Sequence, residues 1–490
     1  HIGDDKPFLI FADGRTISYD AFLRMASCFA NTIKAAGLTA GDRLAVQVEK
    51  SAEALAVYAA CVQSGVIFLP LNTAYKPAEV EYFISDSGAR MLIAGDAESL
   101  QSIAAKHNVI LHDMAVNGRG SFTNLATKAS DRFAPVPLNS DDLAAFLYTS
   151  GTTGRSKGAM LTQNNLLSNA QTLIEAWRFS EADVLLHALP IFHTHGLFVA
   201  TNIILLARAS MIFLPKFDVD SVFAVLPQAT SMMGVPTFYT RLLDDARLTA
   251  DSTRHMRLFV SGSAPLLAET HLQFAERTGQ QILERYGMTE TNMNTTNPYE
   301  GPRRAGTVGK PLAGVDLKIT DSETGATLED GAIGQIEVRG PNVFVGYWNM
   351  PEKTREELRE DGFFITGDLG FIDDQGYVQI VGRNKDLIIA GGYNIYPKEI
   401  ELILDDQPGV LESAVIGVPH ADFGESVVGI LVPDNSGLLD IDKITESVAA
   451  SLAKFKQPRQ LVVVDALPRN AMGKVQKNIL RETYGSAVSA

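Results

Sequence analysis

The sequence predicts an α/β fold with a large N-terminal domain of layered α/β sheets, a β-rich subdomain, and a small α+β C-terminal domain on a hinge. Three observations support this prediction. Short β-branched runs alternate with helix-length segments over roughly the first 300 residues, a pattern that favours sheets covered by helices. The 490 residues exceed what a single hydrophobic core usually accommodates. Beyond about residue 300 the pattern changes to alternating strands with turn signals.

A βαβ unit is predicted near the N-terminus. The segment "GDRLAVQVEK" (41–50) is typical of a strand, "SAEALAVYAACVQSG" (51–65) of a helix that Gly65 ends, and "VIFLPLN" (66–72) of the next strand. Further strand-like runs are "RMLIAGD" (90–96), "ADVLLHALP" (182–190), "ASMIFLP" (209–215), "TSMMGVP" (230–236) and "MRLFVSGSAP" (256–265). We interpret the apolar stretch at 197–215 as a buried helix and strand, because Asn202 and Arg208 interrupt it and would be costly inside a bilayer.

The later part of the chain is predicted to form antiparallel strands and then a compact final domain. Asp-Gly and Asp-Gln-Gly turn signals interrupt the segments 315–340 and 371–383. Two helix–strand pairs follow at 397–419 and 442–468. We therefore expect domains at 1–384 and 385–490, joined by a short hinge, since no low-complexity linker separates them.

Composition limits the classes of partner. Lys and Arg total 42 against 57 Asp and Glu, and the net charge of −15 argues against nucleic acid as a partner. Cys28 and Cys61 are too few for a disulfide framework, and no charged-then-apolar leader opens the sequence. These features favour a cytoplasmic protein without membrane insertion.

The segment "YTSGTTGRSKGAMLT" (148–162) predicts an anion-binding loop. Backbone amides next to its glycines, together with the hydroxyls of Thr149, Ser150, Thr152 and Thr153, are suited to phosphate oxygens. It is not a Walker A loop, because Lys157 is followed by a glycine and not by Ser or Thr. A surface turn is the alternative for a glycine-rich segment taken alone.

Seven segments in order resemble the signatures of the adenylate-forming superfamily, which comprises acyl-CoA synthetases, peptide-synthetase adenylation domains and firefly luciferase. They are "YTSGTTGRSKG" (148–158), "SGSAP" (261–265), "RYGMTE" (285–290), "TGDLG" (366–370), "VGRNKDLI" (381–388), "GGYNIYP" (391–397) and "PRNAMGKVQK" (468–477). The resemblance implies that a carboxylate attacks the α-phosphate of ATP to give an acyl-adenylate and pyrophosphate, with Mg²⁺, after which the thiol of CoA takes the acyl group.

The resemblance also implies roles for individual residues. Lys474 matches the catalytic lysine, and Glu290 matches the catalytic acidic residue that holds Mg²⁺. Lys385 matches the hinge position, and Gly391 and Gly392 the loop that leaves room for pantetheine. The residues that match the ATP and AMP contacts are Thr149, Ser150, Gly151, Thr152, Thr153, Gly154, Lys157, Ser263, Ala264, Pro265, Tyr286, Gly287, Met288, Thr289, Asp368 and Arg383. Among these, Tyr286 is expected to stack on adenine and Asp368 to accept the ribose hydroxyls.

Two arginines suggest which acid is activated. Arg285 directly precedes the tyrosine of its motif, and Arg241 lies about one helical turn after "VPT". Guanidinium groups bind carboxylates in a bidentate manner, so we predict a second carboxylate on the substrate, as in malonate or a similar small dicarboxylate. The stretch "FHTHGLFVATN" (192–202) resembles that of malonyl-CoA synthetases and adds His195 as a candidate wall of the acid pocket. Alternatively, Arg285 pairs with Glu284 or another surface acid, and Arg241 pairs with Asp244 or Asp245.

Other functions remain open on the sequence alone: a fatty-acyl or aryl-CoA synthetase, an adenylation enzyme with a carrier-protein acceptor, a luciferase-like oxygenase, and a binding protein without catalysis. Lys474 and Glu290 are both present, which argues against the last of these. We also expect that a lysine acetyltransferase acting on Lys474 would remove the charge that adenylation needs, and that a deacetylase would restore it.

Overall fold

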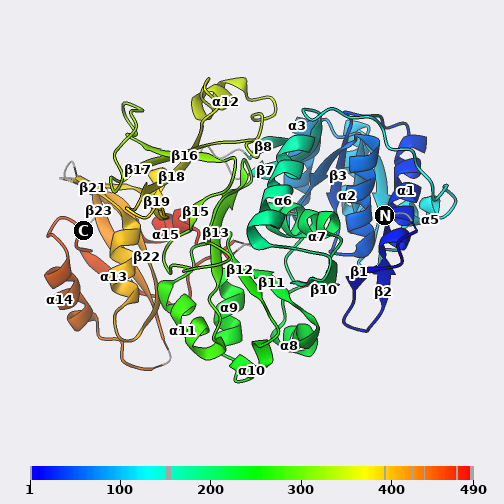
Figure 1. Ribbon diagram of the computed structural model, residues 1–490. Coiled ribbons are helices and arrows are strands. Elements are labelled where there is room, and N and C mark those ends of the chain that lie inside the picture. Colours follow the sequence, from blue (N-terminus) through cyan, green and yellow to red (C-terminus); the bar gives the residue numbers. More distant parts are fainter. Residues whose placement is uncertain are drawn as a thin grey trace. The chain divides into compact units, whose positions relative to one another are not determined.

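The computed structural model describes residues 3–149, 156–390, 393–420, 423–434, 436–470 and 473–485 (Figure 1). The chain divides into two compact units, the first formed by residues 1–316 and 338–364 and the second by 317–337 and 365–490. The predicted boundary at residue 385 falls inside the second unit, so the hinge stays a prediction. Within the described residues the units contain four sheets with helices packed on them, which confirms the predicted α/β class.

The first unit contains a six-stranded sheet in the order β6-β5-β3-β4-β7-β8. Its strands are β3 (Arg43–Gln47), β4 (Ile67–Pro70), β5 (Met91–Ala94), β6 (Ile110–Asp113), β7 (Leu143–Thr149) and β8 (Lys157–Thr162). All pairs are parallel except β7 with β8. The helices of this part are α1 (Tyr19–Ala35), α2 (Ala52–Ser64), α3 (Pro77–Ser87), α4 (Gln101–His107) and α5 (Ser121–Ala126).

Helix α2 illustrates how local sequence sets these elements. The Ser51 hydroxyl accepts a hydrogen bond from the backbone N–H of Ala54, which caps the helix N-terminus. Gly65 ends the helix with φ of 73°, a conformation that glycine adopts without a Cβ penalty. The predicted βαβ unit, including the role of Gly65, is therefore confirmed.

The first unit also contains a nine-stranded sheet in the order β15-β14-β13-β12-β11-β9-β10-β1-β2 over the described residues. Its strands are β1 (Pro7–Ile10), β2 (Thr16–Ser18), β9 (Val184–His187), β10 (Ser210–Phe213), β11 (Ser231–Gly234), β12 (Leu258–Ser261), β13 (Leu283–Met288), β14 (Asn292–Thr296) and β15 (Lys310–Pro311). The neighbours in the series β13-β12-β11-β9-β10-β1 are all parallel. β2 pairs antiparallel with β1, β14 antiparallel with β13, and β15 antiparallel with β14.

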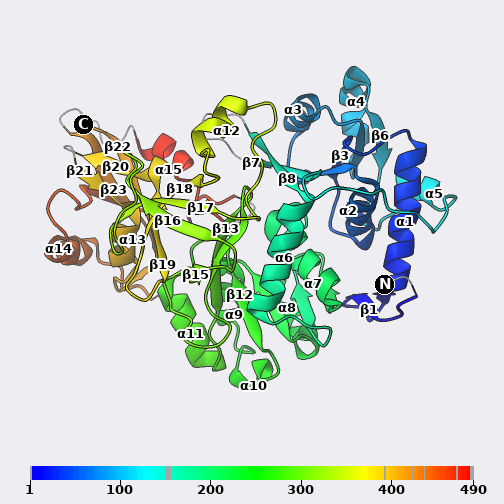
Figure 2. The same ribbon diagram turned by 45° about the horizontal axis from the view of Figure 1, so that its top comes forward.

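Helices α6 (Gln163–Trp177), α7 (Asn202–Ala207), α8 (Val219–Val225), α9 (Pro236–Leu243), α10 (Ala250–Thr253), α11 (Ala268–Thr278) and α12 (Pro351–Glu357) complete the first unit. Figures 1 and 2 show α9 and α11 beside strands β11 and β12. Tyr239 of α9 and Phe274 of α11 pack with Phe259 of β12 in a buried core. The predicted buried stretch at 197–215 includes a π-helix at His195–Thr201, then α7 and β10.

The second unit contains most of a four-stranded sheet in the order β16-β17-β18-β19 and a sheet of the strands β20 to β24. The strands are β16 (Asp316–Thr320), β17 (Gly334–Arg339), β18 (Phe364–Ile372), β19 (Val378–Arg383), β20 (Ile388–Ala390), β21 (Tyr393–Ile395), β22 (Val410–His420), β23 (Gly424–Pro433) and β24 (Gln460–Val463). Its helices are α13 (Pro397–Asp405), α14 (Ile441–Ser451) and α15 (Lys477–Tyr484). The predicted antiparallel strands and both helix–strand pairs are present, but β23 is not among the predicted strands.

Alternating residues of β22 explain how this last sheet is covered. Val415 packs in a cluster with Ile400 of α13 and Ile444 of α14, whereas Ala414 and Ile416 pack with Leu480 of α15. Because neighbouring strand residues point to opposite faces, α13 and α14 cover one face of the sheet and α15 the other.

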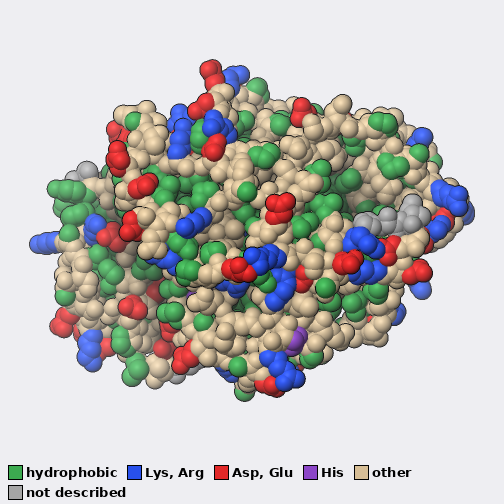
Figure 3. Space-filling model, in the orientation of Figure 1, with side chains coloured by type: hydrophobic (Ala, Val, Ile, Leu, Met, Phe, Trp, Pro, Cys, Tyr) green, Lys and Arg blue, Asp and Glu red, His purple; other side chains and the backbone are tan. Residues whose placement is uncertain are grey.

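Acidic and basic side chains are interspersed on the face drawn in Figure 3. Among the described residues, no helix combines the length and apolar character needed to cross a bilayer.

Candidate functional site

The ends of the anion-binding loop are placed by the β7–β8 pair. Thr149 is the last residue of β7 and lies opposite Lys157, the first residue of β8. The residues between them that were predicted to bind phosphate, Ser150, Gly151, Thr152, Thr153 and Gly154, lie outside the described residues. The Thr149 hydroxyl donates a hydrogen bond of 3.4 Å to Oε1 of Glu290. The structure therefore joins the loop to the predicted Mg²⁺-binding glutamate.

Glu290 belongs to a buried polar cluster with Lys157, Tyr347 and Glu357. The Tyr347 hydroxyl lies 3.0 Å from Oε1 of Glu290 and 2.6 Å from Oε2 of Glu357. Lys157 Nζ lies 3.1 Å from the same hydroxyl and 3.1 Å from Oε2 of Glu357. Tyr347 and Glu357 were not predicted from the sequence, because neither lies in a recognised motif and only the folded chain brings α12 to β8.

The surroundings of Glu290 fit a bound metal ion. Its side chain is 5% exposed, and burial raises the pKa of its carboxyl above the usual value. The hydrogen bonds recorded for its carboxylate come from the hydroxyls of Thr149 and Tyr347. A buried carboxylate in this setting is stabilised in its charged form by a cation, and Mg²⁺ ordinarily takes one or two carboxylates with phosphate oxygens. Over the described residues, no cluster of three or more His, Cys, Asp or Glu forms a metal site of protein ligands alone.

Arg285 on β13 is a further buried charge of the first unit's site region. Its side chain is 3% exposed, and its Nε and Nη2 atoms have no hydrogen-bond partner within the described ranges. Its guanidinium packs against Gly262, where an added Cβ would lie 2.4 Å from Cζ of Arg285. Burial lowers the pKa of Arg285 from 12.5 to about 9, so the group keeps its charge at neutral pH. Burial contradicts the surface position of Arg285 in the alternative, whereas the charge of the neighbouring Glu284 still acts on the guanidinium.

His195 lies near Arg285 and is also buried. Its Nδ1 atom is 3.3 Å from the Ser263 hydroxyl, and its Nε2 atom has no partner in the part of the chain that the structure describes. Burial, and then the positive charge of Arg285, hold the pKa of His195 well below its usual value. The imidazole is therefore neutral beside a charged guanidinium. A buried cation and unpartnered polar atoms together form a site suited to an anionic group.

The π-helix at His195–Thr201 presents His195 to this site. π-helical turns are rare and often occur at functional sites. The sequence gives no periodic signal for this turn, because the run of residues 197–200 at its centre is apolar at every position and helix type cannot be distinguished by periodicity.

Arg241 is not brought to the Arg285 cluster. Its side chain is exposed on α9. Among the described residues no ion pair joins it to Asp244 or Asp245, and Asp245 pairs with Arg247 at 2.7 Å. The structure thus supports neither the pocket interpretation of Arg241 nor its alternative, and a role in acid binding stays a prediction.

The predicted adenine-binding segments lie at one edge of the nine-stranded sheet. Ser263, Ala264 and Pro265 follow β12, whereas Tyr286, Gly287 and Met288 end β13, and Thr289 comes next. β12 and β13 are parallel, with Ser261 opposite Glu284. Ligands of open α/β sheets bind outside the carboxyl ends of such strands, so the two segments are positioned as nucleotide-binding segments require. Ser263 has φ of 72°, which is a strained backbone conformation for a serine. Strained residues of this kind concentrate at ligand sites.

In the second unit, Asp368 and Arg383 face each other across β18 and β19. They are register partners, and Nε of Arg383 lies 3.1 Å from Oδ1 of Asp368. Asp368 is buried, so its carboxylate is held in place by the strand pair and by Arg383. The two residues predicted to contact ribose are thus adjacent.

Lys385 and Lys474 are both exposed in the second unit. Lys385 lies in a short 3₁₀ turn at Asn384–Asp386. Lys474 closes a turn in which its backbone N–H donates to Oδ1 of Asn470 and its carbonyl accepts from the Asn470 N–H. Gly391 and Gly392 lie outside the described residues.

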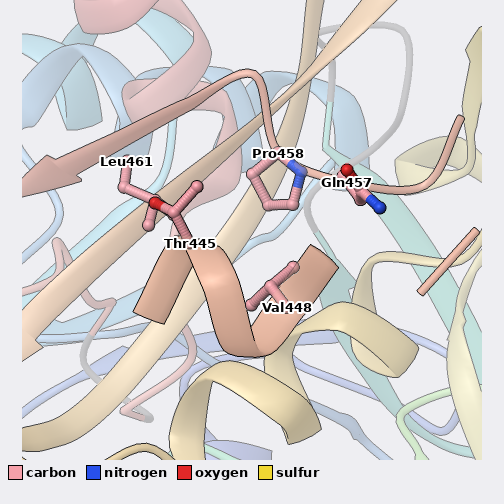
Figure 4. A pocket seen from close by; sticks show the side chains of 5 residues that line it. All are labelled: Thr445, Val448, Gln457, Pro458 and Leu461. Atoms are coloured by element: carbon pink, nitrogen blue, oxygen red, sulfur yellow. The ribbon is translucent and has the colours of Figure 1, made fainter. Parts of the chain in front are cut away.

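A pocket elsewhere in the second unit contains none of the predicted site residues. It lies between α14 and β24 and is lined by Thr445, Val448, Gln457, Pro458 and Leu461 (Figure 4). None of these five side chains is titratable at physiological pH, so they offer no acid or base.

The chain matches two family models, that of the AMP-binding enzymes over residues 3–348 and that of their C-terminal domain over 399–474. A malonate–CoA ligase from Arabidopsis thaliana is 35% identical, covering 97% of this chain and 86% of the relative. A feruloyl-CoA synthase from an Amycolatopsis species is 33% identical, covering 96% of this chain and 95% of the relative. The crystal structure of ATP-bound MatB from Rhodopseudomonas palustris is 56% identical, covers 99% of this chain and 97% of that one, and superposes with a TM-score of 0.97.

Proposed function

The chain belongs to the AMP-binding enzyme family, and we propose that it is an ATP-dependent ligase that joins malonate to CoA, releasing AMP and pyrophosphate. Support for the acid comes from the similarity to a malonate–CoA ligase and from the buried Arg285. Support for ATP comes from the 56% identity to an ATP-bound structure. Methylmalonate is the related dicarboxylate that the same contacts would accept, because an added methyl changes binding by only about 1–3 kcal/mol.

In the first step, one carboxylate of malonate attacks the α-phosphate and pyrophosphate leaves. Thr149, Lys157 and the loop between them are proposed to hold the phosphates, with Lys157 exchanging part of its contact with Glu357 for phosphate oxygens. Mg²⁺ held by Glu290 would neutralise charge that gathers on the phosphates. The segments after β12 and β13 would hold adenine, and Asp368 with Arg383 the ribose. Lys474 is proposed as the cation at the α-phosphate and the attacking carboxylate.

In the second step, the thiol of CoA attacks the carbonyl of the malonyl-adenylate and AMP leaves. We propose that the residues 385–490 rotate about Lys385 between the steps, removing Lys474 and bringing in the loop with Gly391 and Gly392. A hinge residue must accept a change in φ and ψ, and an exposed residue in a short turn can do so without disturbing a core.

The burial of Arg285 with two unpartnered donors is the main structural support for a dicarboxylic acid as the substrate. Its unpartnered Nε and Nη2 donors are buried, and a buried guanidinium without a partner is expensive. The distal carboxylate of malonate would satisfy both donors in a bidentate pair, while the neutral His195 and the Ser263 hydroxyl add contacts. A fatty or aromatic acid would leave these donors unpaired.

We also propose a cytoplasmic location and regulation of Lys474 by acetylation. Within the described residues Cys28 and Cys61 are free thiols, as expected in a reducing compartment. Lys474 has an exposed side chain, which a lysine acetyltransferase can reach.

The test is pyrophosphate release with ATP, Mg²⁺ and CoA against acetate, malonate, methylmalonate, succinate, octanoate and benzoate. We expect malonate to have the highest kcat/KM, and Arg285→Ala to lower that value by roughly 10²-fold, since it removes a charged pairing made to the substrate. Arg254→Ala is the matched control, because Arg254 is an exposed arginine of the same unit with 76% of its side chain accessible. If octanoate or benzoate leads, the dicarboxylate proposal is wrong and the chain is a fatty-acyl or aryl-CoA synthetase.

A further inference from the structure

Lys50 lies in the first unit, between β3 and α2, and makes unusual contacts for a lysine. Its Nζ atom lies 2.7 Å from Nδ1 of His187 and donates a 2.9 Å hydrogen bond to the His187 carbonyl. It also sits 4.4 Å from the centre of the Phe213 ring. Within the described parts of the chain it forms no ion pair, and burial of its amine lowers the pKa of Lys50 well below the usual value. A half-buried lysine whose amine contacts a histidine and no carboxylate is costly, so these contacts need a reason.

The contact with Lys50 determines which nitrogen of His187 carries the proton. Nε2 of His187 lies 2.8 Å from the carbonyl oxygen of Gly196, which can only accept. Nε2 must therefore carry hydrogen. Burial and the neighbouring Lys50 hold the pKa of His187 well below its usual value, so the ring is neutral and Nδ1 is the acceptor of the Lys50 N–H. Lys50 thus favours the one neutral tautomer that can donate to Gly196.

The Gly196 carbonyl belongs to the first turn of the π-helix. It accepts from Nε2 of His187 and from the hydroxyl of Thr201 at 3.1 Å. Gly196 packs closely against the backbone of Pro190, because an added Cβ would lie 2.1 Å from the Pro190 carbonyl oxygen. The start of the π-helix is consequently held by two side chains, that of His187 on β9 and that of Thr201 at the end of the π-helix.

Gly196 is the residue next to His195, which contacts Ser263 and lies near Arg285. A shift of the Gly196 carbonyl rotates the peptide chain that carries His195. Lys50 and His187 are therefore connected through a single carbonyl to the imidazole beside the unpartnered guanidinium.

We propose that Lys50 and His187 are positioning residues for recognition of the acid substrate: Lys50 fixes the tautomer of His187, which holds the Gly196 carbonyl and so keeps His195 against Ser263 and Arg285. This inference rests on the proposed binding of the acid by Arg285 and His195. Neither residue touches the substrate, and the effect is expected on acid binding and not on ATP or CoA.

The decisive variant is Lys50→Met, which keeps the length and apolar stem of the side chain and removes its N–H donors. At pH 8 we expect the KM for malonate to rise about tenfold, as for the loss of one well-placed hydrogen bond, while the KM values for ATP and CoA stay within about twofold. Lys34→Met is the matched control, because Lys34 is an exposed lysine of α1 in the same unit.

The comparison of substrates separates positioning from a general loss of structure. Burial is the larger cause of the lowered pKa of His187 and remains when Lys50 is replaced, so the ring stays neutral in Lys50→Met. Both neutral tautomers then become accessible, and the tautomer without hydrogen on Nε2 cannot donate to Gly196. The malonate KM should therefore rise while the KM values for ATP and CoA do not, whereas a general loss of structure would raise all three.

A second variant makes the tautomer argument testable on its own. In Lys50→Met/His187→Gln, the side-chain amide has an N–H donor for Gly196 at every pH. We expect a malonate KM within about threefold of the wild type. The inference is overturned if Lys50→Met leaves the malonate KM unchanged at pH 8, or raises the KM values for malonate and ATP equally.

The proposed function and this inference fail in different ways. If the wild type does not use malonate, the proposed function is wrong. The KM of Lys50→Met and of the wild type for the preferred acid then decides whether Lys50 and His187 position the π-helix. If the wild type uses malonate and both Lys50 variants behave as the wild type, only the positioning inference is wrong.

Discussion

Gly262 lies between β12 and the guanidinium of Arg285, and replacing it with alanine tests whether the position of that guanidinium determines acid recognition. A Cβ at residue 262 would lie 2.4 Å from Cζ, 2.5 Å from Nε and 2.6 Å from Nη1 of Arg285. Contacts below 3.0 Å are not tolerated, and ordinary contact begins at 3.4 Å, so the guanidinium must move by about 1 Å. The end of an arginine side chain can move this far without unfolding the sheet.

A displacement of about 1 Å at a binding group commonly lowers rates about 10²-fold, which corresponds to about 2.7 kcal/mol. We therefore expect Gly262→Ala to lower kcat/KM for malonate about 10²-fold. The value for acetate, which has no second carboxylate, and the KM for ATP should stay within about threefold.

Pyrophosphate release measures both acids in one assay. Gly95→Ala is the matched control, because its added Cβ would make only ordinary contacts of 3.8 and 3.9 Å. A thermal unfolding midpoint close to that of the wild type would show that the fold survives in both variants. If Gly262→Ala keeps malonate kcat/KM within threefold of the wild type, the guanidinium position does not govern recognition and the reasoning is refuted.

Two further predictions concern the second unit. Lys474→Gln imitates acetylation and should lower the rate of malonyl-adenylate formation by roughly 10²- to 10³-fold. The transfer from preformed malonyl-adenylate to CoA should stay near normal. Near-normal adenylate formation in a pyrophosphate assay would contradict the catalytic role of Lys474. Burial raises the pKa of Asp405 from 3.8 to about 6, so the stability that depends on its neutral form is fully present below pH 3.8 and is lost as the pH rises through 6. Asp405→Asn keeps an acceptor for the Ser413 hydroxyl, which donates at 2.6 Å, and should stabilise the chain by up to about 3 kcal/mol at pH 8 but not at pH 4. Denaturant titrations of the variant and wild type at the two pH values measure this, and an equal difference at both would exclude titration of Asp405 as the cause.

Much of the fold and the placement of the candidate nucleotide-binding residues could be predicted from the sequence, because they depend on local patterns. Alternation and capping located β3, α2 and β4, including the end of α2 at Gly65. The motifs identified the segments of Ser263 and Tyr286, and the structure places them after β12 and at the end of β13, whose parallel order brings both to the same edge of the sheet. The register of Asp368 with Arg383 is likewise a consequence of two strands that their turn residues made recognisable.

The acid site could be predicted only in part, because burial is a property of the packed chain. The sequence made Arg285 and Arg241 equal candidates for binding a second carboxylate of the substrate. In the structure Arg285 is buried on β13 and Arg241 is exposed on α9. The π-helix could not be predicted, since an apolar run that is buried all round has no face and therefore no period. Tyr347, Glu357, Lys50 and His187 lack a motif and acquire partners that are 9 to 200 residues away in the chain.

The sequence by itself determined the α/β class, the family and the chemistry of activating a carboxylate with ATP. These features depend on short contiguous motifs, because the spacing of residues within a motif sets the local backbone shape and the contacts to phosphate. Only the tertiary structure decided which charges are removed from water. Burial distinguishes Arg285 from the exposed Arg241, because the free energy of a charge depends on the solvent and partners around it and not on its neighbours in sequence.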